Sequence, residues 1–117
     1  PRLVQSADGG SVPFLPGAAT PSEAMALADL GYRALKFFPA EPLGGVAALK
    51  ALAAPLPDVV FCPTGGIGPD TARDYLALPN VVAVGGSWVA PAAAIAKEDW
   101  DTITRLSREA AGLAVRI

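Results

Sequence analysis

The stretch RALKFFPAEPLGG, from Arg33 to Gly45, places one lysine inside a run of apolar residues. Residues 34–38 have the length and apolar character of a buried strand, and the Pro and Gly residues that follow are typical of a turn. A helical pattern then runs from Gly44 or Gly45 to Ala54. The stretch therefore predicts a unit of one strand, one turn and one helix.

The same unit recurs along the chain. Apolar runs begin at residues 12, 34, 59 and 81, which are 22, 25 and 22 positions apart. Strands are expected near residues 12–15, 34–38, 59–63 and 81–85. Strands separated by helices pair in parallel, so the sequence predicts one α/β domain over residues 1–117 with about four parallel βα units. An open doubly wound sheet fits this pattern, and so does one half of a (β/α)8 barrel.

The expected helices have recognisable ends. Thr20, Pro21 and Glu23 form the pattern of an N-cap, a first helical residue and a capping box. Asp70 and Asp99 are the expected N-caps of two later helices. Further helices are expected over residues 1–9, 44–54, 70–76 and 99–115.

The composition is unusually apolar for a chain of 117 residues. Hydrophobic residues make up 52% and charged residues 17%, against a charged share of about 25% in typical domains. A small domain has much surface for its volume and should carry more polar residues. We therefore expect part of the surface to be covered by another chain or segment. The net charge of −2 argues against a nucleic-acid partner, which requires a basic patch.

Several classes of protein and site are disfavoured by residue content. Cys62 is the single cysteine and there is no histidine, so an intrachain disulfide, a His-based triad and the commonest metal ligands are excluded. No metal or cofactor is expected. No apolar run reaches the roughly 18–20 residues that span a bilayer, and we expect a cytoplasmic protein. The chain opens on Pro1 without a signal-peptide pattern, so we expect it to be truncated or processed.

Lys36 is the unusual residue of the opening stretch. On a strand it shares one face with Ala34 and Phe38. If that face points inward, desolvation disfavours the ammonium form and favours a nucleophilic amine that forms a Schiff base with a ketone. The alternative is a lysine that extends along its apolar neighbours to solvent. Lys50 and Lys97 lie beside polar positions and are expected to be solvated.

Two glycine-rich loops follow the third and fourth expected strands. Their bare backbone N–H groups suit an anion near a helix N-terminus, although each loop alone is also an ordinary βα turn. Because loops after consecutive strands lie side by side, the pair predicts a shared phosphate site. The candidate residues are Thr64, Gly65, Gly66, Gly85, Gly86 and Ser87.

The other candidates near these loops have simpler interpretations. Cys62 is expected to be a packed structural thiol, because the chain has no histidine to activate it. Trp88 and Trp100 are expected to pack. Glu41 follows the Lys36 strand and is a candidate carboxylate for the site.

Three strings together resemble a known family. FLPGAATPSEAMALADLGYRALKFFPAE, GGVAALKALAAPLPDVVFCPTGGI and DYLALPNVVAVGGSWVAP are similar, in order and spacing, to the C-terminal half of 2-keto-3-deoxy-6-phosphogluconate (KDPG) aldolase. The family also handles 4-hydroxy-2-oxoglutarate (KHG). The resemblance runs from Pro1 to about Leu113.

This resemblance implies strands five to eight of a (β/α)8 barrel in a homotrimer. It implies Lys36 as the Schiff-base lysine, Phe38 as a pocket residue, and no metal. It also implies that residues 64–66 hold the substrate and that the glycines and Ser87 bind its phosphate. The substrate would be a phosphorylated 2-keto acid, cleaved to pyruvate and glyceraldehyde 3-phosphate.

The chain departs from the family pattern in two places. Gly68 replaces the usual Ser or Thr that caps the next helix. The family's general acid/base glutamate and its carboxylate-binding arginine and threonine lie on early strands that this chain lacks. We therefore expect a fragment with little activity alone. A non-catalytic half-barrel assembly module and a phosphate-binding βα protein of another chemistry are the alternatives.

Overall fold

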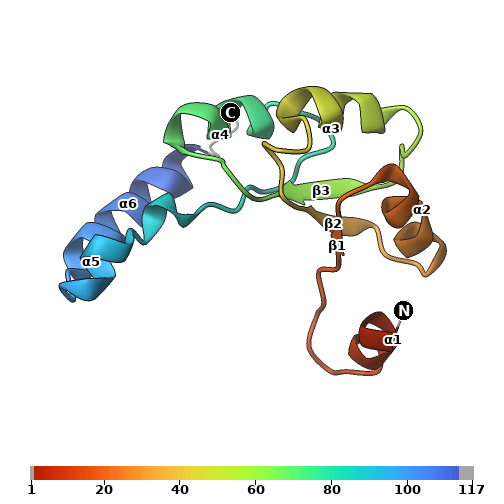
Figure 1. The fold of residues 1–117 in the computed structure, drawn as a ribbon, viewed down its shortest axis with the longest axis horizontal. Helices are drawn as coiled ribbons and strands as arrows, with labels where there is room; N and C mark the ends of the chain where they lie inside the picture. The colour runs from red at the N-terminus through yellow and green to blue at the C-terminus, as the bar shows by residue number, and fades with distance from the viewer. Residues whose placement is uncertain (1, 114–117) are drawn as a thin grey trace.

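The computed structural model describes residues 2–113. Within them, β1, β2 and β3 form a parallel sheet in that order, and helices connect the strands. Over the described residues the fold is α/β with a parallel sheet and six α-helices, which confirms the predicted class (Figure 1). The elements are α1 (Arg2–Asp8), β1 (Gly17–Ala18), α2 (Pro21–Asp29), β2 (Ala34–Phe37), α3 (Gly45–Ala53), β3 (Val60–Pro63), α4 (Pro69–Leu76), the 3-10 helix η1 (Ser87–Val89), α5 (Ala92–Ala96) and α6 (Trp100–Leu113).

Side-chain capping hydrogen bonds mark where α2 and α6 begin. At α2 the Glu23 N–H donates to Thr20 Oγ1 at 3.2 Å, and Glu23 Oε2 accepts from the Thr20 N–H at 3.1 Å. This confirms the predicted capping box. At α6 the Thr102 N–H donates to Asp99 Oδ1 at 3.1 Å, so Asp99 caps as expected. The predicted C-terminal end of this helix, Val115, lies outside the described residues, as does Pro1 of the first expected helix.

The prediction that Asp70 caps its helix was wrong. Gly68 is the N-cap of α4 and Pro69 is its first residue. The Gly68 N–H donates to Thr71 Oγ1 at 3.2 Å. Asp70 lies instead in the first turn, where a carboxylate interacts favourably with the helix dipole.

The first strand lies further along the chain than the expected 12–15. β1 is only Gly17–Ala18. A hydrogen bond from the Lys36 N–H of β2 to the Pro16 carbonyl, at 2.8 Å, joins β2 to the residue before β1. Pro13 and Pro16 have no N–H to donate to a ladder, which disfavours a strand through them. Phe14 is partly exposed and packs edge-on against Tyr32.

The fourth expected strand, 81–85, is reduced to two isolated bridges. Val81 pairs with Phe61 and Gly85 pairs with Thr64, both in parallel. Val81 lies 20 positions after its partner, whereas Gly85 lies 21 positions after its own. One extra residue between the bridges interrupts the regular ladder, as in a β-bulge. The segment still follows β3 as predicted.

The core lies on one side of the sheet. Figure 1 shows α3 and α4 together above β3, while α5 and α6 lie side by side at one end of the molecule. Leu35, Leu49, Phe61 and Tyr75 are fully buried where the sheet meets these helices. The opposite face is open, because Phe38 is 50% and Val82 60% exposed.

None of the helices within residues 2–113 is long and apolar enough to cross a bilayer.

Candidate functional site

Lys36 lies in β2 on the open face of the sheet. Its neighbours Leu35 and Phe37 are buried on the opposite face, toward the helices. This confirms the alternation expected of the opening stretch. Lys36 itself is half-buried, and its partners across the sheet are Gly17 on β1 and Cys62 on β3. Across the sheet, the Lys36 side chain is therefore flanked by a glycine on one side and by the thiol of Cys62 on the other.

The ammonium group of Lys36 contacts an aromatic ring. Its Nζ lies 5.1 Å from the centre of the Phe38 ring, a distance at which a cation is attracted to the ring face. Among residues 2–113, no carboxylate forms an ion pair with it. Phe38 follows β2 at its carboxyl end, so the contact places Lys36 and Phe38 together at that end of the sheet.

The 64–66 loop begins directly after β3 and is tied to the segment that follows β2. The Thr64 N–H donates to the Phe37 carbonyl at 2.9 Å, and the Ala40 N–H donates to the Thr64 carbonyl at 2.8 Å. Gly65 and Gly66 have φ angles of +106° and +78°, which favour glycine. A Cβ on Gly65 would lie 3.2 Å from Phe38 Cδ2. The loop therefore packs against the aromatic ring that Lys36 contacts.

The 85–87 loop uses glycine for a different reason. Neither Gly85 nor Gly86 has a positive φ. A Cβ on Gly85 would lie 2.5 Å from Thr64 Oγ1, and a Cβ on Gly86 would overlap the ring of Trp88. Close approach, not dihedral freedom, explains these glycines. Ser87 opens η1 and is exposed, and its carbonyl accepts from the Ala90 N–H.

The two loops present backbone donors without protein acceptors. Within residues 2–113, the N–H groups of Gly65, Gly66 and Gly86 donate to no other protein group, whereas the Gly85 N–H donates to the Pro63 carbonyl at 2.9 Å. The bridge between Thr64 and Gly85 brings both loops to the same edge of the sheet. Such donors on adjacent loops suit an anionic oxygen. The structure thus brings six of the predicted residues together: Lys36, Phe38, Thr64, Gly65, Gly66 and Gly85.

The carboxylate of Glu41 is bonded to a tyrosine of α4. Its Oε1 accepts a hydrogen bond from the hydroxyl of Tyr75, which is fully buried in α4 on the helix side of the sheet. Burial and the Glu41 carboxylate raise the pKa of the Tyr75 hydroxyl. Within residues 2–113, this candidate carboxylate is therefore paired with Tyr75 and forms no ion pair with Lys36. Sequence reasoning missed Tyr75, which lies 34 positions from Glu41 along the chain and has no local signal.

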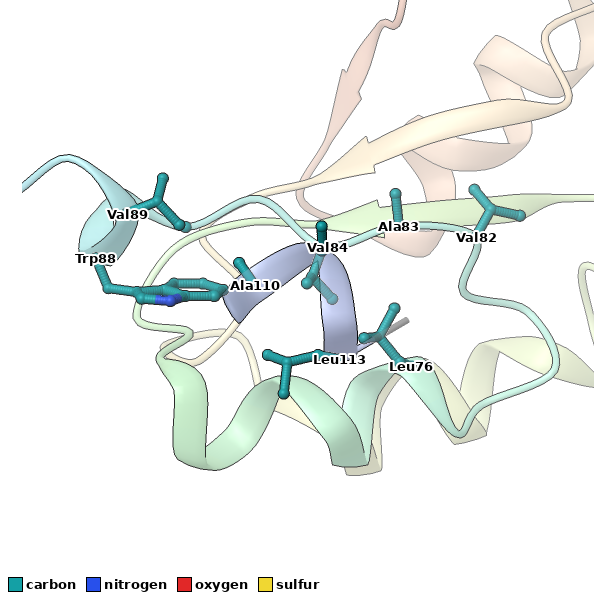
Figure 2. A pocket seen from close by; sticks show the side chains of 10 residues that line it. Leu76, Val82, Ala83, Val84, Trp88, Val89, Ala110 and Leu113 are labelled. Carbon is teal, nitrogen blue, oxygen red and sulfur yellow. The ribbon is translucent and has the colours of Figure 1, made fainter. Parts of the chain in front are cut away.

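An apolar cavity lies apart from Lys36, between the 82–89 segment and α6 (Figure 2). In Figure 2, Trp88 reaches toward Ala110 and Leu113, and Val84 points into the same space. Its lining carries hydrocarbon and indole groups with no ionisable side chain. This confirms the packing role expected of Trp88, whereas the same expectation for Trp100 was wrong, because Trp100 is 57% exposed. The cavity itself offers no reactive group.

The chain resembles characterised proteins over nearly all of its length. A family model described as KDPG and KHG aldolase matches residues 1–106. The KHG/KDPG aldolase of Escherichia coli strain K12 is 53% identical over 108 residues, which cover 92% of this chain and 51% of that protein. The 2-dehydro-3-deoxy-phosphogluconate aldolase of Pseudomonas aeruginosa is 52% identical over 109 residues, covering 93% and 50%. The chain therefore spans about half the length of these curated relatives.

Solved structures show the same pattern. The KDPG aldolase of Legionella pneumophila, with pyruvate captured at low pH as a covalent carbinolamine intermediate, matches with a TM-score of 0.85 and 45% identity. The match covers 89% of this chain and 50% of that one. The aldolase of Zymomonas mobilis ZM4, solved with 3-phosphoglycerate, matches with a TM-score of 0.80 and 48% identity, covering 87% and 49%.

Proposed function

Because the chain belongs to the KDPG and KHG aldolase family, we propose that it supplies the Schiff-base lysine and the phosphate-binding loops of a class I aldolase, a lyase. The proposed reaction cleaves 2-dehydro-3-deoxy-6-phosphogluconate to pyruvate and glyceraldehyde 3-phosphate. The observation that carries the proposal is the position of Lys36. Its amine emerges on the open face of the sheet, at the end where two loops present N–H groups that donate to no acceptor within residues 2–113.

The proposed chemistry begins at the Lys36 amine. Nζ attacks the C2 ketone, a C–N bond forms, and a proton moves to the oxygen to give a carbinolamine. Loss of water gives an iminium, which acts as the electron sink. A base removes the proton of the C4 hydroxyl, the C3–C4 bond breaks, and its electron pair forms an enamine as glyceraldehyde 3-phosphate leaves. Protonation at C3 and hydrolysis then release pyruvate and the free amine.

The loops are proposed to hold the phosphate end of the substrate. The unpaired N–H groups of Gly65, Gly66 and Gly86 would donate to phosphate oxygens, and the Ser87 hydroxyl is proposed as a fourth donor. Phe38 and Thr64 would lie between the phosphate and the amine. The pyruvate carbinolamine captured in the Legionella aldolase is consistent with a Schiff-base amine, and the 3-phosphoglycerate solved with the Zymomonas aldolase is consistent with a phosphorylated ligand.

We assign the proton transfers to residues outside this chain. Glu41 is the carboxylate that follows the Lys36 strand, and its oxygen is engaged by Tyr75 on the other side of the sheet. The chain also spans about half of its relatives. A chain without its general acid/base is expected to turn over about 10²–10⁴-fold more slowly than the complete enzyme.

The open face supports a half-barrel arrangement. It carries Phe38, Val82 and the half-buried Cys62. Burying such a face against further strands would complete a barrel. The same observation favours the second candidate function, an assembly module whose site residues are idle. In either case we propose that the chain associates, with a missing half or as a homo-oligomer. Elution as a compact monomer that unfolds cooperatively would contradict this.

Reductive trapping tests the aldolase proposal. Incubation with pyruvate and borohydride should add one pyruvate-derived group at Lys36, located by peptide mass spectrometry. Lys36→Ala should abolish the adduct, whereas Lys50→Ala, at an exposed position on α3, should retain it. Equal labelling of Lys36, Lys50 and Lys97, or no labelling at all, would refute the Schiff-base assignment and leave the assembly module as the better candidate.

A further inference from the structure

We propose that Glu41 and Tyr75 are positioning residues that hold the 64–66 loop in the shape required to bind the phosphate group of the substrate. Both residues lie outside the phosphate contacts assigned above, and the inference rests on the proposed function for the identity of the ligand. Its first support is the hydrogen bond from the Tyr75 hydroxyl to Glu41 Oε1, which joins α4 to the segment after β2.

The backbone of Glu41 is bonded to the loop itself. Its N–H donates to the Gly65 carbonyl at 3.1 Å, next to the Ala40 N–H that donates to the Thr64 carbonyl. These two bonds orient the peptide planes of residues 64–66. Because each peptide plane carries a carbonyl on one side and an N–H on the other, fixing the carbonyl of Gly65 also fixes the direction of the following N–H, that of Gly66.

The side chain of Glu41 also sets the space available to the loop. A Cβ on Gly66 would lie 2.8 Å from both Cβ and Cγ of Glu41. Gly66 therefore rests directly on the aliphatic part of this side chain. If the carboxylate were released from Tyr75, the side chain would gain rotamer freedom and Gly66 would lose a fixed surface.

The surroundings of the Tyr75 hydroxyl are shaped for this contact. A Cβ on Gly45 would lie 2.9 Å from the hydroxyl and 3.3 Å from Glu41 Oε1. Only glycine at position 45 leaves room for the hydrogen-bonded side chains of Glu41 and Tyr75. Tyr75 is fully buried, so its hydroxyl requires an acceptor, and Glu41 supplies it. The pair is thus built into the packing at the junction of three segments.

The test compares Tyr75→Phe with Tyr32→Phe. The second tyrosine also donates to a carboxylate, Asp8 at 3.2 Å, but at the other end of the strand that carries Lys36. Binding of inorganic phosphate and of glyceraldehyde 3-phosphate would be measured by calorimetry, and pyruvate trapping at Lys36 in parallel. Tyr75→Phe should weaken phosphate binding about 3- to 10-fold, the effect of one lost hydrogen bond. Trapping should be unchanged, and Tyr32→Phe should alter neither.

A conservative variant and a ligand-free readout complete the design. Glu41→Gln keeps an acceptor for Tyr75 and should bind phosphate as well as the wild type, whereas Glu41→Ala should resemble Tyr75→Phe. Amide hydrogen exchange should accelerate at Ala40 and Glu41 in Tyr75→Phe, but not at Val82, whose N–H donates to the Phe61 carbonyl.

The outcomes separate this inference from the proposed function. Unchanged exchange at Ala40 and Glu41, or unchanged phosphate affinity in Tyr75→Phe, would overturn it. Parallel loss of trapping and phosphate binding would also overturn it, because it would indicate general destabilisation. A wild-type chain that forms no adduct with pyruvate would refute the aldolase proposal, and the exchange measurement would still decide whether Tyr75 holds the loop.

Discussion

Replacing Gly85 by alanine should force apart the two loops that meet at the edge of the sheet. The added Cβ would lie 2.5 Å from Thr64 Oγ1 and 3.1 Å from Thr64 Cγ2. Carbon atoms in good contact are about 3.5–4.0 Å apart, so the loops must separate or Thr64 must leave its rotamer. Thr64 is β-branched and stiff, and the Gly85 N–H is bonded to Pro63. Because neither the Thr64 side chain nor the Gly85 backbone can move without cost, we expect the free energy of unfolding to fall by about 1–3 kcal/mol.

Urea denaturation followed by far-UV circular dichroism measures this loss. Gly9→Ala is the matched control, because a Cβ there meets nothing within 4 Å and φ is not positive. Removing the opposing atoms should relieve the clash, so Thr64→Ala combined with Gly85→Ala should recover at least about 1 kcal/mol relative to additivity. An unchanged midpoint for Gly85→Ala, or strictly additive effects in the double variant, would refute the steric reasoning.

Two further predictions concern helix caps. Thr20→Ala removes the acceptor for the Glu23 N–H and should lower the free energy of unfolding by about 1 kcal/mol, with the neighbouring Ser22→Ala as the control; equal midpoints for the two would contradict the capping role. The hydrogen bonds from Thr102 lower the pKa of Asp99 from its ordinary value of 3.8. The Asp99 carboxylate therefore stabilises the fold fully above pH 3.8, and this stabilisation is lost as the pH falls through the lowered pKa of the folded state. The stability difference between the wild type and Asp99→Ala, followed by urea titration, should shrink on acidification; a difference that stays constant with pH would exclude the carboxylate as its source.

The sequence predicted best where a local physical rule applies. The alternation of the strand correctly predicted that Lys36 lies on one face of the sheet and Leu35 and Phe37 on the other, because successive strand residues point to opposite faces. The capping box at Thr20 and the cap at Asp99 were likewise predicted and are confirmed. For the glycines after β3, the alternative to a phosphate site was an ordinary turn that needs glycine dihedrals, and the positive φ angles of Gly65 and Gly66 show that the turn does need them.

The predictions failed where position depends on the neighbouring strand. The apolar residues 12–15 indicated a strand, but pairing falls on Gly17 and Ala18, which have weak strand preferences of their own. At residues 81–85 a change of register breaks the ladder, and no residue type signals this. The role of Glu41 depends on Tyr75, which only tertiary packing brings close.

The glycine contacts have a consequence for protein engineering. Gly65 packs against the backbone of Pro39 and Ala40 and the ring of Phe38, whereas Gly66 packs on Glu41, Gly85 on Thr64 and Gly86 on Trp88. For the first three glycines, the atoms that limit the space come from a different segment of the chain. A single loop grafted from a relative would arrive without the residues that pack against it in that relative. Residues 38–41, 64–66 and 85–88 should therefore be exchanged between homologues together with Gly45 and Tyr75, which contact Glu41, and libraries that diversify these turns should vary them jointly.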